Sequence, residues 1–268
     1  MSAFDPTDHG AAWDGKTDDS AAIRASIADA VANGGGVIHF PARPIRCHSN
    51  LPITGNNLIF EGEGDATCFH WGGDGGLFLN SDPSQVRRRI AWRDFSFDGM
   101  HAAKSGLFEF DNFYKCSVRE VYASRFGGVA HHLIGSVGHS TYYNDFYHCP
   151  IVSSLPGSSA IVIDGEANQN QWSDCPIQTT AEAGPAVVSN GGAMQRIVGT
   201  YFQGEPGAVF IHGAAGTRFR LTNCHFDTGT IVVDEPAGLW IWLGCSYSRS
   251  TTVADRSGSA VRVGDLPG

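Results

Sequence analysis

Apolar and polar residues recur along this chain with a period far longer than that of a helix or a hairpin. Seven segments share one skeleton, in which an apolar residue, two polar or small residues and another apolar residue follow one another: AWRDFSF, SVREVYA, YYNDFYH, QWSDCPI, IVGTYFQ, RLTNCHF and IWLGCSY. The fourth residues of these segments are Asp94, Glu120, Asp145, Asp174, Thr200, Asn223 and Gly244. Successive members of this series are 26, 25, 29, 26, 23 and 21 residues apart. A repeat of this length is typical of a solenoid.

The positions that flank each fourth residue are mostly apolar. The residues two before it are Trp92, Val118, Tyr143, Trp172, Val198, Leu221 and Trp242, and those just after it are Phe95, Val121, Phe146, Cys175, Tyr201, Cys224 and Cys245. The two sets stand three residues apart, so the two-residue alternation of a single strand breaks between them. We expect two short strands joined by a tight two-residue corner, with both sets pointing inward, since Asp, Asn, Thr and Gly suit turns.

A second series of segments follows the same period. GGLFLN, GLFEFD, SAIVID, PAVVSN, GAVFIH, GTIVVD and SAVRVG each end an apolar strand, on Asn80, Asp111, Asp164, Asn190, His212, Asp234 and Gly264, and AHHLIG, ending at Gly135, fills the gap. Three short strands per turn without intervening helices predict an all-β fold, a parallel β-helix of about eight coils stacked ~4.8 Å apart. The aligned Cys175, Cys224 and Cys245 are then expected to stack inside the rod.

Composition and charge exclude several classes of protein. The 268 residues carry a net charge of −9, and the only dense basic run, Arg87 to Arg89, is interpreted as the solvated lead-in to a strand. A nucleic-acid partner is not expected, because the net charge is negative and such binding depends on clustered Lys and Arg. Membrane insertion is not expected, because no apolar run approaches ~18 residues. The first thirty residues lack the apolar region of a signal peptide. The seven cysteines include no CxxC pair, which argues against a disulfide framework or a zinc knuckle.

The segment GAAWDGKTDDSAAIRA near the N-terminus could be a phosphate- or metal-binding loop or the start of a helix. It lacks the GxxxxGK[ST] pattern of a phosphate-binding loop. Asp18, Asp19 or Ser20 can instead cap a helix whose apolar stripe is Ile23, Ile27 and Val31 and which ends at Asn33 and the following glycines. We expect this helix to close the end of the solenoid. Residues 1–45 form the N-terminal segment with its capping helix, and residues 46–268 form one continuous β-helix.

These N-terminal residues carry a family resemblance. GAAWDGKTDDSAAIRASIADAVANGGGVIHFP resembles the signature of the pectate-lyase-like right-handed parallel β-helix superfamily, in which GDGxxDD/T precedes a helix and GGxVxFPxG leads into the first coil. The superfamily includes polysaccharide lyases, glycoside hydrolases and bacteriophage tailspikes. Two departures stand out: Trp13 takes the place of a usual glycine, and Pro41-Ala42-Arg43-Pro44 replaces Pro-x-Gly-x-aromatic.

The resemblance implies a carbohydrate-directed protein. The leading interpretation is a phage or prophage tailspike-like protein, a homotrimer associated with the virion, that binds or depolymerises a bacterial surface polysaccharide. One alternative is a stand-alone polysaccharide lyase or glycoside hydrolase, cytoplasmic or released without a signal peptide. Another is a non-catalytic structural virion component or adhesin. The fold does not choose among them, because one fold hosts several chemistries.

The polar column at the strand ends is the first candidate site. Asp164, Asn190, His212 and Asp234 are expected on four consecutive coils, with Glu166 just past Asp164. At ~4.8 Å per coil, His212 and Asp234 could touch. Glycoside hydrolysis needs two carboxyl groups, ~5 Å apart for retention and ~6.5–9.5 Å for inversion, and Asp164 with Glu166 could meet either distance. His212 could be the base of a lyase, but no Lys or Arg in the column would neutralise a uronate. The alternative is that these residues only terminate strands at turns.

The second candidate site lies in FSFDGMHAAKSGLFEFDNF, which crowds Asp98, His101, Lys104, Glu109 and Asp111 onto two neighbouring strands. Glu109 and Asp111 alternate with Phe108 and Phe110, so both carboxylates are expected on the outer face. Phe108 and Phe110 are more simply core residues than sugar platforms.

No cofactor is expected. His131, His132, His139 and His148 match no metal-ligand motif. Calcium at the acidic turn EGEGD, residues 61–65, stays open but lacks EF-hand spacing.

Overall fold

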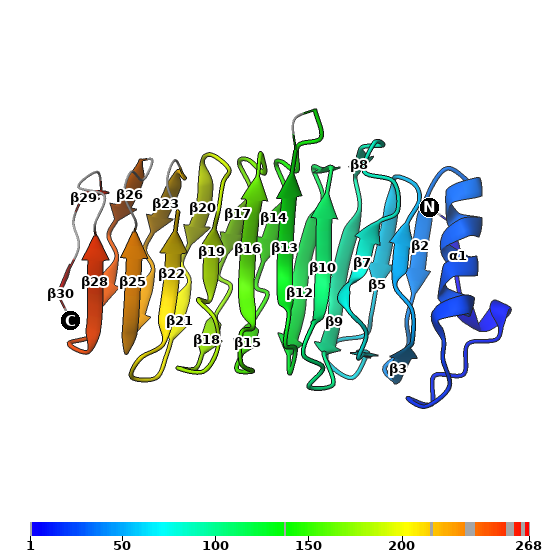
Figure 1. Ribbon diagram of the computed structural model, residues 1–268. Helices are drawn as coiled ribbons and strands as arrows, with labels where there is room; N and C mark the ends of the chain where they lie inside the picture. Colours follow the sequence, from blue (N-terminus) through cyan, green and yellow to red (C-terminus); the bar gives the residue numbers. More distant parts are fainter. Residues whose placement is uncertain are drawn as a thin grey trace.

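The protein is a rod of stacked coils with one helix across its end (Figure 1). The computed structural model describes residues 2–136, 138–214, 217–233, 239–255, 260–263 and 266–267. Within these ranges one sheet contains nine parallel strands, one per coil, which corresponds to about eight complete turns. The predicted all-β parallel β-helix is therefore confirmed.

Each typical coil contributes three strands. The first row consists of β2 (Gly36–His39), β5 (Leu58–Glu61), β9 (Ala91–Asp98), β12 (Ser117–Ser124), β14 (Asp145–Tyr147), β17 (Gln171–Ser173), β20 (Gln195–Val198), β23 (Phe219–Thr222), β26 (Trp240–Leu243) and β29 (Ala260–Val263), with β1 (Ala3–Phe4) beside β2. The second row consists of β3 (Pro44–Cys47), β6 (Cys68–Trp71), the later halves of β9 and β12, β15 (Ile151–Ser153), β18 (Ile177–Thr179), β21 (Tyr201–Gln203), β24 (His225–Asp227), β27 (Ser246–Tyr247) and β30 (Leu266–Pro267). The nine-stranded sheet is the third row: β4 (Leu51–Ile53), β7 (Gly75–Asn80), β10 (Ser105–Asp111), β13 (Val129–Gly135), β16 (Ser159–Gly165), β19 (Val187–Ser189), β22 (Val209–Gly213), β25 (Gly229–Val233) and β28 (Thr251–Asp255). A short pair, β8 (Arg87–Arg88) and β11 (Phe113–Tyr114), lies where the third row turns back into the first.

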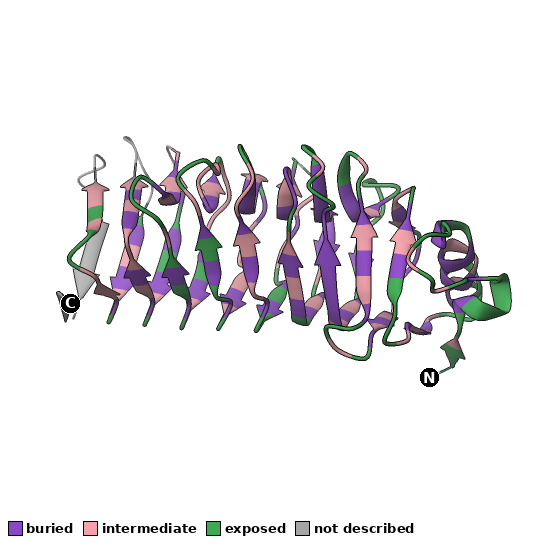
Figure 2. Ribbon diagram, turned by 90° about the horizontal axis from the view of Figure 1, so that it is seen from below, coloured by how far each residue is buried: buried purple, intermediate pink, exposed green. Residues whose placement is uncertain are grey.

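Inward residues of successive coils stack on one another to form the core. Buried and less buried positions alternate along strands such as β2 and β5 (Figure 2). Trp172 stacks on Phe146 of the preceding coil with ring centroids 5.0 Å apart, and Trp92 stacks on Phe60 at 5.6 Å. Aromatic side chains bury large apolar areas, so these stacks stabilise each coil against its neighbour.

The corner between the first and second rows is a single residue in the left-handed conformation rather than the two-residue turn that we expected. Strand pairing and positive φ values place it at Asp94, Glu120, His148, Asp174, Gly199, Asn223 and Gly244. The predictions for Asp145 and Thr200 are wrong, because Phe146 pairs with Trp172 and Ile197 takes the next place in that row. One left-handed residue turns the chain while its neighbours on both sides still point inward, which explains the break in alternation.

Left-handed backbone at a residue other than glycine costs free energy, so we predict that Glu120→Gly stabilises the protein. Glu120 has a φ of 52°, and its exposed carboxylate lies 3.8 Å from His148 Nε2, a contact of little energetic weight. Relief of the conformational cost, less the entropy of a new glycine, should raise the free energy of unfolding by about 0.5 to 1 kcal/mol. Urea denaturation measures this change. Glu120→Gln is the control, since it keeps the backbone cost, and an equal gain in both variants would contradict the explanation.

The cysteines that follow this corner form the expected internal stack. Cys149, Cys175, Cys224 and Cys245 are all buried and are free thiols, with Thr200 at the intervening coil. Cys149 joins the three predicted members because the corner of its coil is His148. The Cys175 thiol donates to the carbonyl oxygen of Phe146 in the coil before it. These cysteines are structural, as predicted.

Helix α1 (Ser20–Ala32) covers the open end of the first coil, as predicted (Figure 1). Ile23 and Ile27 are buried and Val31 packs against the core. Asp19 is the N-cap residue by position, but its carboxylate accepts a hydrogen bond from the backbone of Ala12 instead of from the helix. The glycines after Asn33 end the helix with the paired carbonyl contacts of a Schellman motif. Among the described residues no helix is long and apolar enough to cross a membrane.

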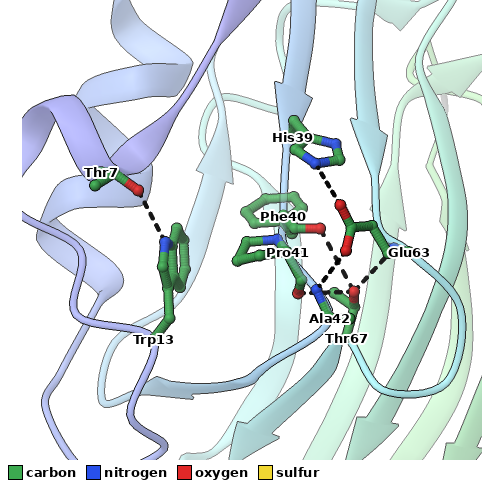
Figure 3. A network of polar contacts seen from close by, with 8 residues as sticks. All are labelled: Thr7, Trp13, His39, Phe40, Pro41, Ala42, Glu63 and Thr67. Atoms are coloured by element: carbon green, nitrogen blue, oxygen red, sulfur yellow. Dashed lines mark hydrogen bonds and ion pairs between the residues drawn. The ribbon is translucent and has the colours of Figure 1, made fainter.

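Trp13, the first departure from the family signature, adopts a left-handed backbone conformation. Its φ is 53°, in the region that favours glycine. Its indole donates to Thr7 Oγ1 at 2.9 Å and packs edge-on against Phe40, with ring centroids 6.2 Å apart (Figure 3). In the second departure, the backbone of Ala42 donates to the Glu63 carboxylate (Figure 3). Side-chain contacts thus hold both variant turns in place.

Candidate functional site

The outer face of the nine-stranded sheet brings together acidic residues from both sequence segments: Glu109 and Asp111 from one, and Asp164 from the other. Strands β10, β13 and β16 are consecutive in that sheet. Glu109 lies opposite His132, and Asp111 lies opposite Ile134, which in turn lies opposite Asp164. Asp111 and Asp164 are therefore level with each other, two strands apart, which corresponds to about 10 Å between their Cα atoms.

Neighbouring strands hold both oxygens of the Asp164 carboxylate. His132 Nε2 lies 2.7 Å from Oδ2, and Asn190, just past β19, donates to Oδ1 at 2.8 Å. The hydrogen bond from His132 lowers the pKa of Asp164, and the bond from Asn190 adds to this effect, while burial opposes it. A carboxyl group held in this way is ionised at neutral pH and can accept a proton from a bound water.

Asp111 lies in the opposite electrostatic environment. Burial raises its pKa, and the charge of Glu109 on the same strand raises it further, while His139 and His132 act against this. Its Oδ1 atom is buried without a hydrogen-bond partner in the described part of the chain. Two carboxyl groups whose pKa values are pushed apart are what an acid and base pair requires.

A hollow of about 280 Å³ lies beside Glu109 and His132 on the same face. Its floor is made of the glycines Gly75, Gly76, Gly106, Gly127 and Gly128, and Lys104, Glu109 and His132 also line it. A Cβ atom at Gly75 would lie 3.3 Å from Glu109 Oε2, and side chains on the other glycines would meet backbone atoms. The glycines therefore allow neighbouring coils to approach closely beside Glu109 and His132.

The two adjacent histidines of β13 point in opposite directions. His131 is fully buried, stacks on Phe146 at 4.6 Å between ring centroids, and accepts a hydrogen bond from Trp172 Nε1. Burial lowers the pKa of His131 to about 3. His132 points outward to Asp164. The pair is thus one core residue and one member of the candidate site.

The remaining predicted residues lie apart from these contacts. Glu166 is exposed past the left-handed turn at Gly165, and its backbone donates to the carbonyl of Gly135. His212 on β22 pairs with Val188, so it stands two residues earlier in register than Asn190. The expected single column therefore has a shift at His212. Asp234, its expected partner, lies outside the described residues.

Asp98 and two acidic residues of the 61–65 turn have structural partners. Asp98 is buried beside Arg125, and the acidic turn at residues 61–65 places Glu61 2.6 Å from Arg93 and Glu63 3.1 Å from His39. Across the described ranges no three His, Cys, Asp or Glu side chains are placed together to hold a metal ion.

Sequence reasoning missed the part of His132 in this site. The alternation of AHHLIG along a strand would have placed one histidine inside and the other outside. It could not have shown that the outward histidine meets Asp164, 32 residues later in the chain.

Comparison with solved structures shows the same fold in viral proteins. The tailspike protein of Acinetobacter phage vB_ApiP_P1 matches over 99% of this chain and 58% of its own, at 14% identity and a TM-score of 0.70. ORF18 of Geobacillus virus E2 matches over 99% of this chain and 60% of its own, at 18% identity and a TM-score of 0.67. The tailspike gp49 of Acinetobacter baumannii bacteriophage Fri1, a capsular polysaccharide depolymerase, matches over 99% of this chain and 62% of its own, at 11% identity and a TM-score of 0.63.

The chain thus spans about three fifths of the length of these structures. No protein-family model matches it, and no curated protein sequence is similar to it. The likeness lies in the fold: the chain is a parallel β-helix, as these viral proteins are.

Proposed function

We propose that this β-helix cleaves a bacterial surface polysaccharide by hydrolysis, as part of a phage or prophage tailspike-like protein. The observation that carries the proposal is the pair Asp111 and Asp164, which share one open sheet face while their pKa values are shifted in opposite directions. The likeness to tailspikes, one of them a capsular polysaccharide depolymerase, supports the choice of substrate class.

The geometry favours hydrolysis with inversion. Protonated Asp111 gives its proton to the glycosidic oxygen, and the Asp164 carboxylate takes a proton from the water that attacks the opposite face of the sugar. The Cα atoms of Asp111 and Asp164, two strand spacings or about 10 Å apart, leave room for that water, whereas retention needs carboxyl groups ~5 Å apart. His132 and Asn190 orient the Asp164 carboxylate and act as positioning residues.

A lyase fits this face less well. β-Elimination requires a cation near the uronate carboxylate. The charges that act on Asp111 come from Glu109, His139 and His132. Lys104 lines the adjoining hollow, and its Nζ atom forms an ion pair with Asp74 Oδ2 at 3.6 Å. The arrangement therefore supports an acid and base pair better than an elimination site.

The test is depolymerisation of a panel of purified capsular polysaccharides. Hydrolysis predicts new reducing ends without ultraviolet absorbance from an unsaturated uronate, and NMR of the first products should show inverted anomers. Products with unsaturated ends would favour the lyase. If the protein binds one or more capsular polysaccharides and releases no new reducing ends from any of them, the result would favour a non-catalytic adhesin or structural component of the virion.

We also propose that the protein is a homotrimer, as the tailspike resemblance implies. Light scattering should then give three times the 28.6 kDa mass of one chain. A monomer at micromolar concentration would contradict this proposal without touching the chemistry above.

A further inference from the structure

A second hollow lies around the corner from the acidic face. Its volume is about 800 Å³, and its lining includes Asn112, next to Asp111, and the two neighbours of His139. It follows the edge of the rod where β8 and β11 pair, at the top of Figure 1. The hollow and the proposed active site are therefore adjacent, and one extended ligand could occupy both.

One straight row of side chains crosses this hollow over four coils. Arg88 pairs with Tyr114, Tyr114 with Tyr142, and Tyr142 with Asn168. At one coil per ~4.8 Å the row is about 14 Å long, enough for several linked sugar units. The row begins with a cation, continues with two aromatic rings and ends with an amide.

The aromatic part is a platform of three tyrosines. The Tyr114 and Tyr142 ring centroids are 4.6 Å apart, and Tyr143 lies 5.4 Å from Tyr142. Tyr143 is 45% exposed, although it also adopts a left-handed φ of 58°. The Tyr114 and Tyr142 rings are inclined by 31° and cover each other's faces, so sugar contact falls to their edges and to the exposed Tyr143 ring. The face of an aromatic ring attracts the weakly positive C–H groups of a sugar, and polar groups nearby bind its hydroxyls. Such a platform suits a carbohydrate.

The basic residues at the hollow favour an acidic carbohydrate over a neutral one. Arg88 lines it, and Lys115 Nζ lies 5.0 Å from the centroid of the Tyr114 ring. None of the described lining residues is acidic, although the chain as a whole carries a charge of −9. Arg87, in contrast, is buried and donates to Asn80 at 2.9 Å, so this basic run is only partly the solvated lead-in that we expected. A local positive field on an acidic protein favours an anionic ligand.

We propose that this tyrosine groove binds an anionic segment of the glycan, with sugar units against the exposed Tyr143 ring and the edges of the Tyr114–Tyr142 stack, and a uronate carboxylate at Arg88. This inference names the charge class of the substrate and rests on the proposed function for the glycan itself. A nucleic acid would use similar groups, but a single lining arginine on so acidic a chain gives it too few phosphate contacts.

The test is calorimetric titration of the full chain carrying Asp164→Asn, so that binding is measured without cleavage. The probes are the tetrasaccharides of galacturonate, of mannuronate and of hyaluronan, with neutral maltotetraose and an octathymidylate for comparison. We expect at least one acidic tetrasaccharide to bind, more weakly at high salt, and the other two probes not to bind. Tyr142→Ala should weaken that binding about 10-fold, and Arg88→Gln should weaken it by a similar factor and remove much of its salt dependence.

Two further variants separate stacking from folding. Tyr142→Phe keeps the ring and should bind like the parent. Tyr201→Ala removes an exposed tyrosine on β21, which stacks on His225 outside the groove, and should leave the affinity unchanged. Failure of all three acidic probes, equal affinity for maltotetraose, binding of octathymidylate, or binding that survives Tyr142→Ala would each overturn the inference. Cleavage of a capsule by the wild type is measured separately, so these failures would leave the hydrolase proposal standing.

Discussion

Replacing Asp111 or Asp164 by Asn is expected to lower the rate of polysaccharide cleavage by about 10³-fold, with the fold retained. Asp111→Asn removes the proton that the leaving oxygen needs. Asp164→Asn removes the carboxylate that activates water, while its amide oxygen can still accept a hydrogen bond from His132 Nε2. The measurement is the rate of reducing-end release from a capsule that the wild type cleaves, with circular dichroism as a check on folding.

Glu166→Gln is the matched control, because this exposed carboxylate lies past the turn that follows β16. It should cleave at the wild-type rate. Full activity in Asp111→Asn or in Asp164→Asn, or a loss in Glu166→Gln as large as in those two, would move the chemistry away from this pair. His132→Gln should show a smaller loss and a shifted pH profile, since His132 acts through Asp164.

Acid is expected to destabilise the protein through a single core histidine. Burial lowers the pKa of His131 to about 3, whereas in the unfolded chain it is near 6.5. Between these values the unfolded state binds a proton that the folded state does not, so stability falls as the pH drops from about 6.5 toward 3. The loss is on the order of 4 kcal/mol. A protonated His131 would also lose the acceptor that Trp172 Nε1 uses.

His131→Phe should flatten this part of the pH profile, and urea denaturation at several pH values measures it. The ring can stack on Phe108 and Phe146 as histidine does, while loss of the Trp172 partner should cost about 1 kcal/mol at neutral pH. His101→Asn removes an exposed histidine and should leave the slope unchanged. An identical slope in wild type and His131→Phe would contradict this account. The lowered pKa of Asp164 also makes acid destabilising, but it affects both proteins equally.

The coil period could be predicted because each coil places apolar residues at the same inward positions. Trp92, Trp172 and Trp242 recur at one inward position, and the cysteines recur at another. The exact corner could not always be predicted. In YYNDFYH the apolar spacing fits two registers, and only the pairing of Phe146 with Trp172 places the corner at His148.

A second turn was invisible in the sequence. The turn after the third row uses left-handed residues such as Arg89, Lys115, Tyr143, Gln169 and Met194, none of which signals a turn by its chemistry. Stacked coils impose this backbone shape on whatever residue falls there, at a local cost that packing offsets. The tyrosine groove lies along this turn and was missed for the same reason.

The candidate site was only half predictable. Alternation placed Glu109 and Asp111 on an outer face, and the strand ends marked Asp164. That Asp164 meets His132, and that Asp111 comes level with it, depends on the register of coils about 25 to 30 residues long, where a shift of two residues changes the partner. His212 is an example, because it pairs with Val188 and therefore lies two residues away in register from Asn190.

The sequence by itself determined the class of fold, the capping helix, the direction in which side chains point, and the internal place of the cysteines. These follow from local periodicity, which the chain carries in every coil. Only the tertiary structure decided which outward side chains become neighbours, because contacts between coils join residues far apart in the chain. The opposite pKa shifts of Asp111 and Asp164, and the row from Arg88 to Asn168, exist only in that assembled register.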